Sequence, residues 1–277
     1  MMRAYVLALA AAAALLPGCT SVETTKAGAV GVEREQRMAV SAEEVAASSR
    51  KAYAEMMADA QKKGVLDRDP AQVQRVKAIV GRLVPQVSAF RSDARKWPWE
   101  VHVLSVPEVN AWCMPEGKMA IYGGLIEKLH ASDAEIAAVM GHEIAHALRE
   151  HVREQISRQV VTQTAVGIAG ALLGVGELGQ NLGNMVADVT LNLPKSRQAE
   201  TEADRIGVEL AARAGYDPRA AIHLWEKMAK LSESEPPKWL STHPPHQDRV
   251  KDLQIYAEKV LPLYQAAAKS GGASTGK

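Results

Sequence analysis

The sequence has few aromatic residues, two cysteines and almost no net charge. Aromatic residues make up 4% of the 277 positions, with five tryptophans but one phenylalanine, which argues against a base-stacking surface. The two cysteines, Cys19 and Cys113, are too few for a disulfide scaffold. A formal net charge of +1 makes no electrostatic case for nucleic-acid binding, which needs a concentrated basic surface. Since 47% of the residues are hydrophobic, the chain can still bury a sizeable core.

The sequence also lacks an apolar run long enough to cross a membrane. The N-terminal run Val6–Leu16 has eleven residues, whereas a spanning helix needs about 20. Preceded by one basic residue, it is typical of a secretory signal peptide, which we place at residues 1–18. The motif Leu16-Pro17-Gly18-Cys19 resembles a bacterial lipobox, although its proline departs from the usual small or branched residue. We therefore expect lipid attachment at Cys19 and a lipidated tether over residues 19–32. The alternative is an ordinary signal peptide with an incidental cysteine.

One domain, residues 33–269, is expected to follow, with a Gly/Ser-rich disordered tail at 270–277. Helical periodicity and capping residues predict many helices, and alternating β-branched residues predict a few short strands. The glycine-rich segment 160–194 should form one or two loosely formed helices. The fold class is therefore α+β, predominantly α-helical, with a small β-sheet. The predicted helices lie at about 33–63, from 70, 132–153, 194–215, from 218 and 247–269, and the strands at 100–106, 110–114 and 118–122.

A His-Glu-x-x-His motif lies inside the helix that is predicted to begin at a Ser132–Glu135 capping box. His142 and His146 are four residues apart and share one helix face, so both imidazoles can bind one zinc ion. Glu143 is offset from that face but close enough to contact a water on the ion. The alternative is a pair of histidines on an apolar helix face, each bonded to a carbonyl group.

A catalytic zinc needs a third protein ligand and an open position. His151 lies nine residues after His142, about 180° around the same helix, and should face away. Glu200 and Asp204 share a face of a later helix, so Glu200 can bind the metal while Asp204 holds the far nitrogen of a ligand histidine. Glu202 points away from that face and is expected at the surface. The alternative for this cluster is a solvated acidic face paired with nearby arginines.

Several segments together resemble the zinc metallopeptidases related to the CAAX prenyl protease. The resemblance is specifically to the soluble periplasmic branch, which includes BepA-like proteins and mitochondrial OMA-type enzymes, and it covers roughly residues 73–264. It implies a gluzincin-type metallopeptidase domain with Glu200, not Glu202, as the third ligand. The matching segments are Asn110–Pro115, Gly117–Tyr122, Gly124–Leu125, Met140–His146, Ser196–Gly207 and Ser241–Arg249.

Two departures from the family narrow what the resemblance implies. No transmembrane helix is predicted, so prenylated membrane substrates are not expected. No helical-repeat domain follows the peptidase domain, so the partner docking of longer relatives cannot be assumed.

The expected function is a zinc endopeptidase with one Zn2+ per chain on His142, His146 and Glu200. Zinc lowers the pKa of a bound water toward about 7, and Glu143 takes the proton as general base and passes it to the leaving amine. The resemblance implies that peptides add to an open edge strand, which is largely blind to side chains. Unfolded or misfolded envelope proteins are therefore the expected substrates. The expected edge strand consists of Lys118, Met119, Ala120, Ile121 and Tyr122.

Lipid attachment would anchor the protein on the periplasmic side of a bacterial envelope. Thr20 after Cys19 is not the aspartate that retains many such proteins at the inner membrane, so we expect the outer membrane. The alternative function is a lipid-anchored chaperone or assembly factor for outer-membrane proteins, with little proteolysis. An intact Glu143 favours the enzyme, because holding a peptide needs no general base.

His243 lies between the proline pairs Pro236-Pro237 and Pro244-Pro245, so its backbone has little freedom. It can pack in the loop, donate a hydrogen bond to the oxyanion during catalysis, or enter the open zinc position as a plug. The family resemblance places it near the metal, which favours the last two roles. We expect the plug, because an enzyme that accepts any unfolded chain has most need of a latent state.

Overall fold

The computed structural model describes residues 20–167, 175–245 and 248–272 of the chain. The expected signal peptide and Cys19 lie outside these residues. Among the helices in the described part, none is both long enough and apolar enough to cross a membrane.

A three-stranded sheet forms the centre of the domain. Its strands are β3 (Glu100–Leu104), β4 (Ala111–Met114) and β5 (Lys118–Tyr122), close to the predicted positions. The order is β3-β5-β4, with β3 parallel and β4 antiparallel to β5. The turn between β4 and β5 is the 3-10 helix η4 (Pro115–Gly117). Gly117 is required there, because its φ is +78° and Trp99 fills the space of a Cβ atom.

The prediction that Lys118–Tyr122 is an open edge strand is wrong. β5 is the central strand, and its backbone pairs with β3 on one side and β4 on the other. No side of β5 is left for an added strand, because each backbone N–H and C=O takes part in one ladder. The outer strands are β3 and β4, and β4 packs against α5 (Asp133–Leu148).

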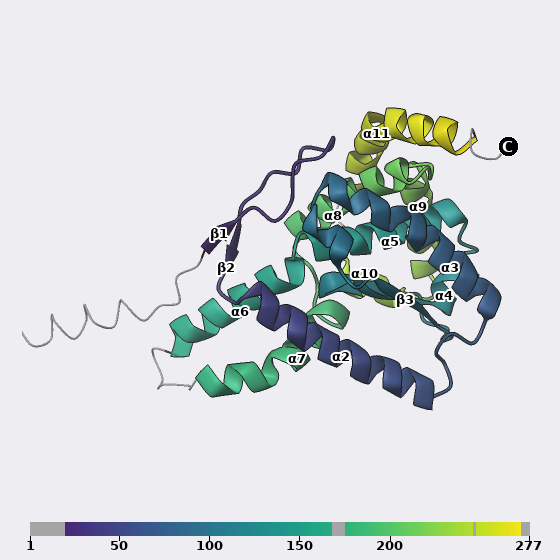
Figure 1. The fold of residues 1–277 in the computed structure, drawn as a ribbon. Coiled ribbons are helices and arrows are strands. Elements are labelled where there is room, and N and C mark those ends of the chain that lie inside the picture. The colour runs from purple at the N-terminus through teal and green to yellow at the C-terminus, as the bar shows by residue number, and fades with distance from the viewer. Residues whose placement is uncertain (1–19, 168–174, 246–247, 273–277) are drawn as a thin grey trace, which may run out of the picture.

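Helices cover both faces of the sheet (Figure 1). α5 and α3 (Pro70–Leu83) pack on one face, where they share the main hydrophobic core with β3. α2 (Ala42–Lys62) and α7 (Val175–Leu191) cover the other face. The remaining helices are η2 (Val84–Ala89), η3 (Asp93–Lys96), α4 (Gly123–Lys128), α6 (His151–Gly167), α8 (Arg197–Arg213), α9 (Ala220–Ser232), α10 (Lys238–Thr242) and α11 (Arg249–Gly272).

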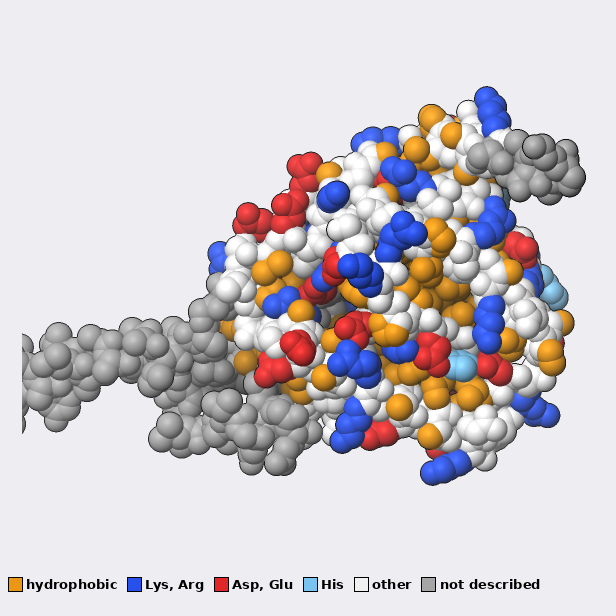
Figure 2. Space-filling view, in the orientation of Figure 1, with side chains coloured by type: hydrophobic (Ala, Val, Ile, Leu, Met, Phe, Trp, Pro, Cys, Tyr) orange, Lys and Arg blue, Asp and Glu red, His pale blue; other side chains and the backbone are white. Residues whose placement is uncertain are grey.

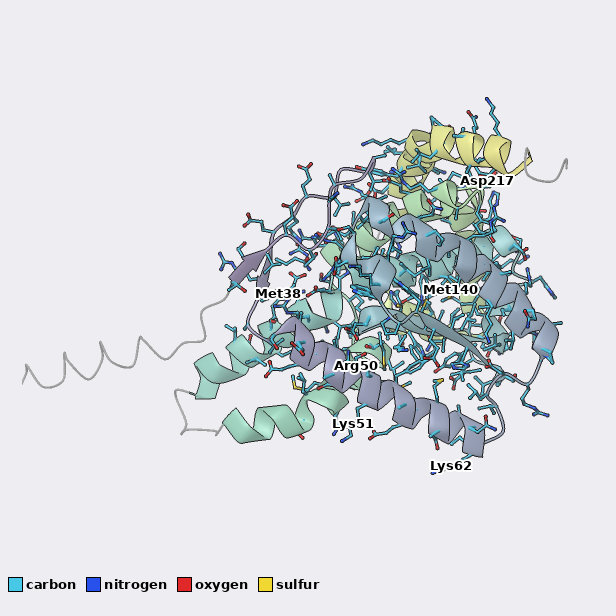
Figure 3. The ribbon with its side chains drawn as sticks, in the orientation of Figure 1. Met38, Arg50, Lys51, Lys62, Met140 and Asp217 are labelled. Carbon is cyan, nitrogen blue, oxygen red and sulfur yellow. The ribbon has the colours of Figure 1, made fainter. Side chains whose placement is uncertain are left out.

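The helix α5 runs through the core. It begins at the predicted capping box, where the Ser132 side chain accepts the Glu135 N–H and the Glu135 carboxylate accepts the Ser132 N–H. Each residue from 135 to 148 is buried, and Met140 lies at the centre of the side chains in Figure 3. By contrast, the charged side chains of α2 that Figure 3 labels, Arg50, Lys51 and Lys62, are exposed.

The helix predicted over residues 132–153 is interrupted. α5 ends at Leu148, and Glu150 has a φ of +49°, in the left-handed region that ends a right-handed helix. α6 then begins at His151. The chain therefore changes direction without a glycine or proline, and His151 does not lie on an extension of α5.

The N-terminal segment, which we define as residues 20–38, packs on the domain. Its first strand, β1 (Thr20–Val22), pairs antiparallel with β2 (Gln36–Met38). Between them, Val30 is buried in the main core, and its N–H donates to Glu209 of α8 at 3.0 Å. Much of the expected tether over residues 19–32 is therefore packed on the domain. The free energy gained by burying its apolar residues outweighs the conformational entropy that the segment loses.

Two other boundaries differ from the expected ones. The helix expected from about residue 33 begins at Ala42, after the N-cap Ser41. The last helix continues to Gly272, and the rest of the expected tail lies outside the described residues.

The surface agrees with the near-neutral composition. On the face in Figure 2, basic and acidic side chains alternate and do not gather into a patch of one sign. Cys113 is buried within the main core, as expected for a small apolar side chain.

Candidate metal centre

The two histidines of the motif point their Nε2 atoms at the same place. These atoms of His142 and His146 are 3.0 Å apart, and both side chains are almost completely buried. The predicted helical spacing produces this arrangement, since residues four apart lie one turn above each other.

Close contact between α5 and α8 brings a carboxylate to the histidines. The helices cross at Gly141 and Gly207, where a Cβ on either glycine would lie less than 3.0 Å from backbone atoms of the other helix. At this separation, Glu200 Oε1 lies 3.3 Å from His146 Nε2, and Glu200 Oε2 lies 3.6 Å from His142 Nε2.

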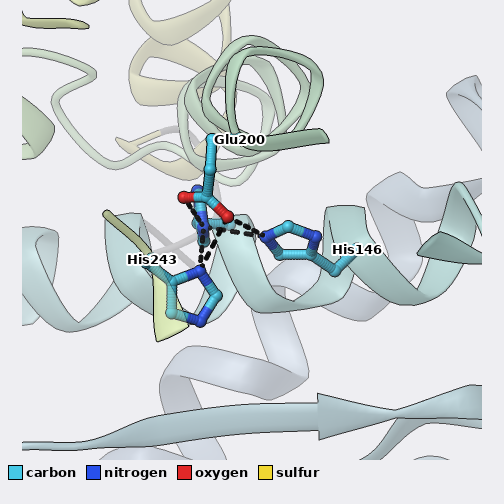
Figure 4. Close-up of side chains that lie close together, drawn as sticks. His146, Glu200 and His243 are labelled. Carbon is cyan, nitrogen blue, oxygen red and sulfur yellow. Dashed lines mark hydrogen bonds and ion pairs between the residues drawn. The ribbon is translucent and has the colours of Figure 1, made fainter. Parts of the chain in front are cut away.

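His243 closes the cluster from a third direction, after the short helix α10 (Figure 4). Its Nδ1 lies 3.0 Å from Glu200 Oε1 and 3.2 Å from His142 Nε2. The Trp239 ring stacks on the His243 ring with centroids 4.6 Å apart, which holds the imidazole in place. One ligand atom from each of His142, His146, Glu200 and His243 lies within 4.8 Å of the others, close enough for all four to share one ion.

The charges of Glu200 and His146 suit a cation. Burial would raise the pKa of Glu200, but His243, His146 and Arg249 outweigh it and hold that pKa well below its usual range. Burial lowers the pKa of His146 well below its usual value, which favours the neutral ring with a lone pair to offer. An ionised carboxylate and a neutral imidazole are the forms that bind zinc.

Glu143 lies beside the cluster and is buried, with 3% of its surface exposed. Its Oε1 accepts a hydrogen bond from Trp239 Nε1 at 2.7 Å and lies 3.4 Å from His243 Nε2. The segment that carries Trp239 and His243 therefore contacts both the carboxylate of Glu143 and the ligand cluster.

The structure brings Asp204 to the far nitrogen of His142. Asp204 Oδ1 lies 3.0 Å from His142 Nδ1, and Arg249 of α11 donates to both Asp204 and Glu200. Burial would raise the pKa of Asp204, but Arg249 and His142 lower it, so the carboxylate stays ionised. Sequence spacing anticipated the position of Asp204, but it did not anticipate Arg249.

The prediction that Glu202 lies at the surface is wrong. It points away from the cluster, as expected, but only 6% of it is exposed. Its partners are His151, Arg149 and Arg34, and the last of these is 168 positions away in sequence. No local spacing signals this cluster, because the N-terminal segment and the break after α5 supply most of it.

His151 does not belong to the group of four, but it is not remote from them. Because α6 begins a new direction, His151 Nδ1 lies 2.8 Å from His146 Nδ1, on the side away from the cluster. His102 of β3 contacts Asp67 and Glu100 through its two nitrogens.

The buried pair of histidines on one helix, the carboxylate from a second helix and the adjacent glutamate define a metallopeptidase site of the His-Glu-x-x-His class. Residues 70–257 match the family model described as Peptidase family M48, and the chain belongs to this family. The expected family and the α+β, mostly helical fold are therefore confirmed.

The chain is similar to named proteases of plants, animals and bacteria. It is 38% identical to mitochondrial metalloendopeptidase OMA1 of Arabidopsis thaliana over 60% of this chain and 34% of that protein. It is 26% identical to metalloprotease YcaL of Escherichia coli (strain K12) over 90% of this chain and 94% of that protein. It is 27% identical to the beta-barrel assembly-enhancing protease of Yersinia pestis over 73% of this chain and 42% of that protein. The chain spans only 34–41% of the OMA1 proteins of A. thaliana, Bos taurus and Danio rerio.

Proposed function

We propose that the chain is a zinc-dependent endopeptidase. The observation that carries the proposal is the convergence of His142, His146 and Glu200 at one buried point, with the buried carboxylate of Glu143 beside it against His243. The donor set fits zinc, which takes imidazole nitrogen and carboxylate oxygen as ligands. When bound, zinc supplies a Lewis acid that polarises a carbonyl group and lowers the pKa of a water to about 7.

The chain's own side chains divide the remaining work. Glu143 takes a proton from the attacking water and delivers it to the leaving amine. The hydrogen bond from Trp239 Nε1 orients its carboxylate. Asp204 keeps the proton of His142 on Nδ1, so Nε2 presents a lone pair to the metal.

The outer side of β4 is the best candidate for binding an extended substrate. Tyr122 N–H donates to Asn110 C=O, so alternation along an antiparallel pair turns the backbone groups of Ala111 and Cys113 away from β5. Of these groups, Ala111 N–H donates to the Asn110 side chain. No strand pairs with this side within the part of the chain that the structure describes. β4 also packs against α5, and the charge of Glu143 adds to burial in raising the pKa of Cys113.

A peptide added at β4 would be held by backbone hydrogen bonds, so we propose unfolded or misfolded envelope proteins as the substrates.

The proposed peptidase activity can be tested by comparing β-casein digestion by the wild type and by Glu143→Gln, with zinc measured in both. We expect zinc in both and a loss of about 10²–10⁴-fold in the variant, as for a missing acid–base group. Equal rates would reject Glu143 as the base. Zinc without cleavage, in both the wild type and His243→Ala, would instead favour a chaperone or assembly factor.

We also propose that the structure represents a latent state with His243 as the plug. His243 Nδ1 lies among the ligand atoms, 3.0 Å from Glu200 Oε1 and 3.2 Å from His142 Nε2, where it can take the position that a water needs. His243→Ala, assayed on a short unstructured peptide, should cleave faster than the wild type and cleave itself. A loss of about 10²–10³-fold would instead identify an oxyanion donor, and an unchanged rate would reject both roles.

For the location, we propose a lipid at Cys19 and the periplasmic side of the outer membrane. The lipobox-like motif and the similarity to YcaL and the beta-barrel assembly-enhancing protease support a bacterial envelope protein. Cys19→Ser should release the protein from membranes and leave its peptidase activity unchanged. A wild type found wholly in the soluble periplasmic fraction would contradict the anchor.

A further inference from the structure

The two histidines of α5 have different partners at their far nitrogens. His142 Nδ1 faces a carboxylate, Asp204. His146 Nδ1 faces a second histidine, His151, at 2.8 Å, and His151 Nε2 lies 3.1 Å from Glu202 Oε2. His151 is 2% exposed, so water does not easily replace either contact.

The direction of each hydrogen bond follows from Glu202. A carboxylate only accepts, so the proton of His151 is on Nε2, where it donates to Glu202. The other nitrogen of that ring, Nδ1, then accepts, and its donor is the Nδ1–H of His146. His146 Nε2, which points at the cluster, is thereby left with the lone pair that a metal ion needs.

Two arginines hold Glu202 in place. Arg149 Nε donates to Glu202 Oε2 at 2.9 Å, and Arg34 Nε donates to Glu202 Oε1 at 2.6 Å. Arg34 also donates to both carboxylate oxygens of Glu154 on α6, at 2.7 and 2.9 Å. Arg34 thus bridges the two acidic side chains that flank His151.

The N-terminal segment supplies more of this network than Arg34. Gln36 Nε2 lies 2.7 Å from both the Arg149 carbonyl and Glu154 Oε2. The hydroxyl groups of Thr24 and Thr25 accept from Arg149 NH1 at 3.2 Å. The segment therefore completes a buried set of hydrogen bonds. Its departure would leave Glu154 of α6 without its hydrogen-bond donors and Glu202 of α8 with only Arg149 and His151.

We propose that His151 and Glu202 are positioning residues for His146, and that the N-terminal segment, through Arg34, is part of the support of the metal centre. The inference rests on the proposed zinc site. Because His151 fixes the tautomer and orientation of His146, its loss should weaken zinc binding by about 10–100-fold, as losses of such outer partners do. Docking of the segment and metal binding should then favour each other, since two events that stabilise one arrangement are reciprocally coupled.

The tautomer can be observed without any metal. Two-bond ¹H–¹⁵N NMR on zinc-free Glu143→Gln protein, labelled at histidine, reports which nitrogen of each ring is protonated. We expect the His146 proton on Nδ1 in this parent, and a shift toward Nε2 in His151→Phe. His151→Asn should restore it, because the side-chain oxygen replaces the Nδ1 acceptor. An Nε2–H form of His146 in the parent would overturn the proposal, even if His151→Phe fails to fold.

Zinc affinity, measured by chelator competition in the same background, separates positioning from general stability. We expect His151→Phe to bind zinc about 10–100-fold more weakly than the parent. His151→Asn should recover most of this affinity, and Arg34→Gln should lose less affinity than His151→Phe. The matched control is Arg75→Gln, because Arg75 also ties two segments together, through Asp133 and the Ala131 carbonyl, far from these histidines.

The outcomes are distinct. A parent that binds no zinc would reject the proposed function. A parent that binds zinc, with unchanged affinity in His151→Phe and Arg34→Gln, would reject the positioning role and leave the function standing. An equal loss of zinc affinity in Arg75→Gln would also reject the positioning role, because the loss would then reflect a general decrease in the stability of the fold.

Discussion

The two sides of the zinc-binding motif are supported in different ways. On the His142 side, one carboxylate of α8, Asp204, and one arginine of α11 complete the support within the helical core. On the His146 side, the support passes through His151 and Glu202 to Arg34 of the N-terminal segment. The support of His142 consists of side chains from two helices, whereas the support of His146 also depends on the N-terminal segment.

The difference shows how one helix can serve both histidines. α8 places Glu200 between them, Asp204 behind one, and Glu202 on its opposite side behind the other. Both faces of α8 can carry charge only because arginines from distant segments neutralise it. Burying these carboxylates without Arg249 and Arg34 would cost several kcal/mol each.

The largest effect should come from the residue that both sides share. Glu200→Gln should lose its zinc, because the amide brings neither the charge nor the basicity of the carboxylate to the ion. Metal analysis after dialysis checks this. Glu202→Gln, two residues along the same helix, is the matched control and should keep zinc with weakened affinity. Full zinc content in Glu200→Gln would overturn the ligand assignment.

An intermediate effect should separate the two sides. Asp204→Asn should weaken zinc binding by about 10–100-fold, measured by chelator competition. If the supports are independent, the effects of Asp204→Asn and His151→Phe should add in free energy within about 0.5 kcal/mol. A double variant no weaker than either single variant would show that the two sides act as one.

A smaller effect should appear in the pH dependence of the stability that Glu154, on the His146 side, contributes. Burial would raise the pKa of Glu154, but hydrogen bonds from Arg34 and Gln36 outweigh it and lower that pKa from 4.5. A carboxylate with a lowered pKa stabilises the fold above its unfolded pKa, and this contribution is lost as the pH falls. The wild type should therefore exceed Glu154→Gln in unfolding free energy by about 1–3 kcal/mol at pH 7. The difference should shrink below about pH 4.5.

Denaturant unfolding of the zinc-free proteins measures this difference. Asp59→Asn is the control, because Asp59 forms an exposed pair with Lys63 and should change stability little at any pH. A Glu154→Gln difference that is constant from pH 7 to pH 3 would show that ion pairing with Arg34 does not support this side.

Local patterns predicted the parts of the site that lie within single helices. The capping box of α5, the shared face of His142 and His146, and the pairing of Glu200 with Asp204 all follow from helical spacing. The three strands were also predicted, since alternation and a turn signal are local features. Their order was not, because β3 joins β5 through contacts that no spacing encodes.

The sequence by itself determined the helix that carries the zinc-binding motif, the spacing of its histidines and the face that Glu200 and Asp204 share. The tertiary structure alone decided that β5 is central, that α5 breaks at Glu150 so that His151 meets His146, and that Glu202 is buried against Arg34. The physical reason is the range of the interactions. Periodicity and capping act within a few residues, whereas strand order, helix breaks and buried charge pairs depend on partners that the fold brings together from distant parts of the chain.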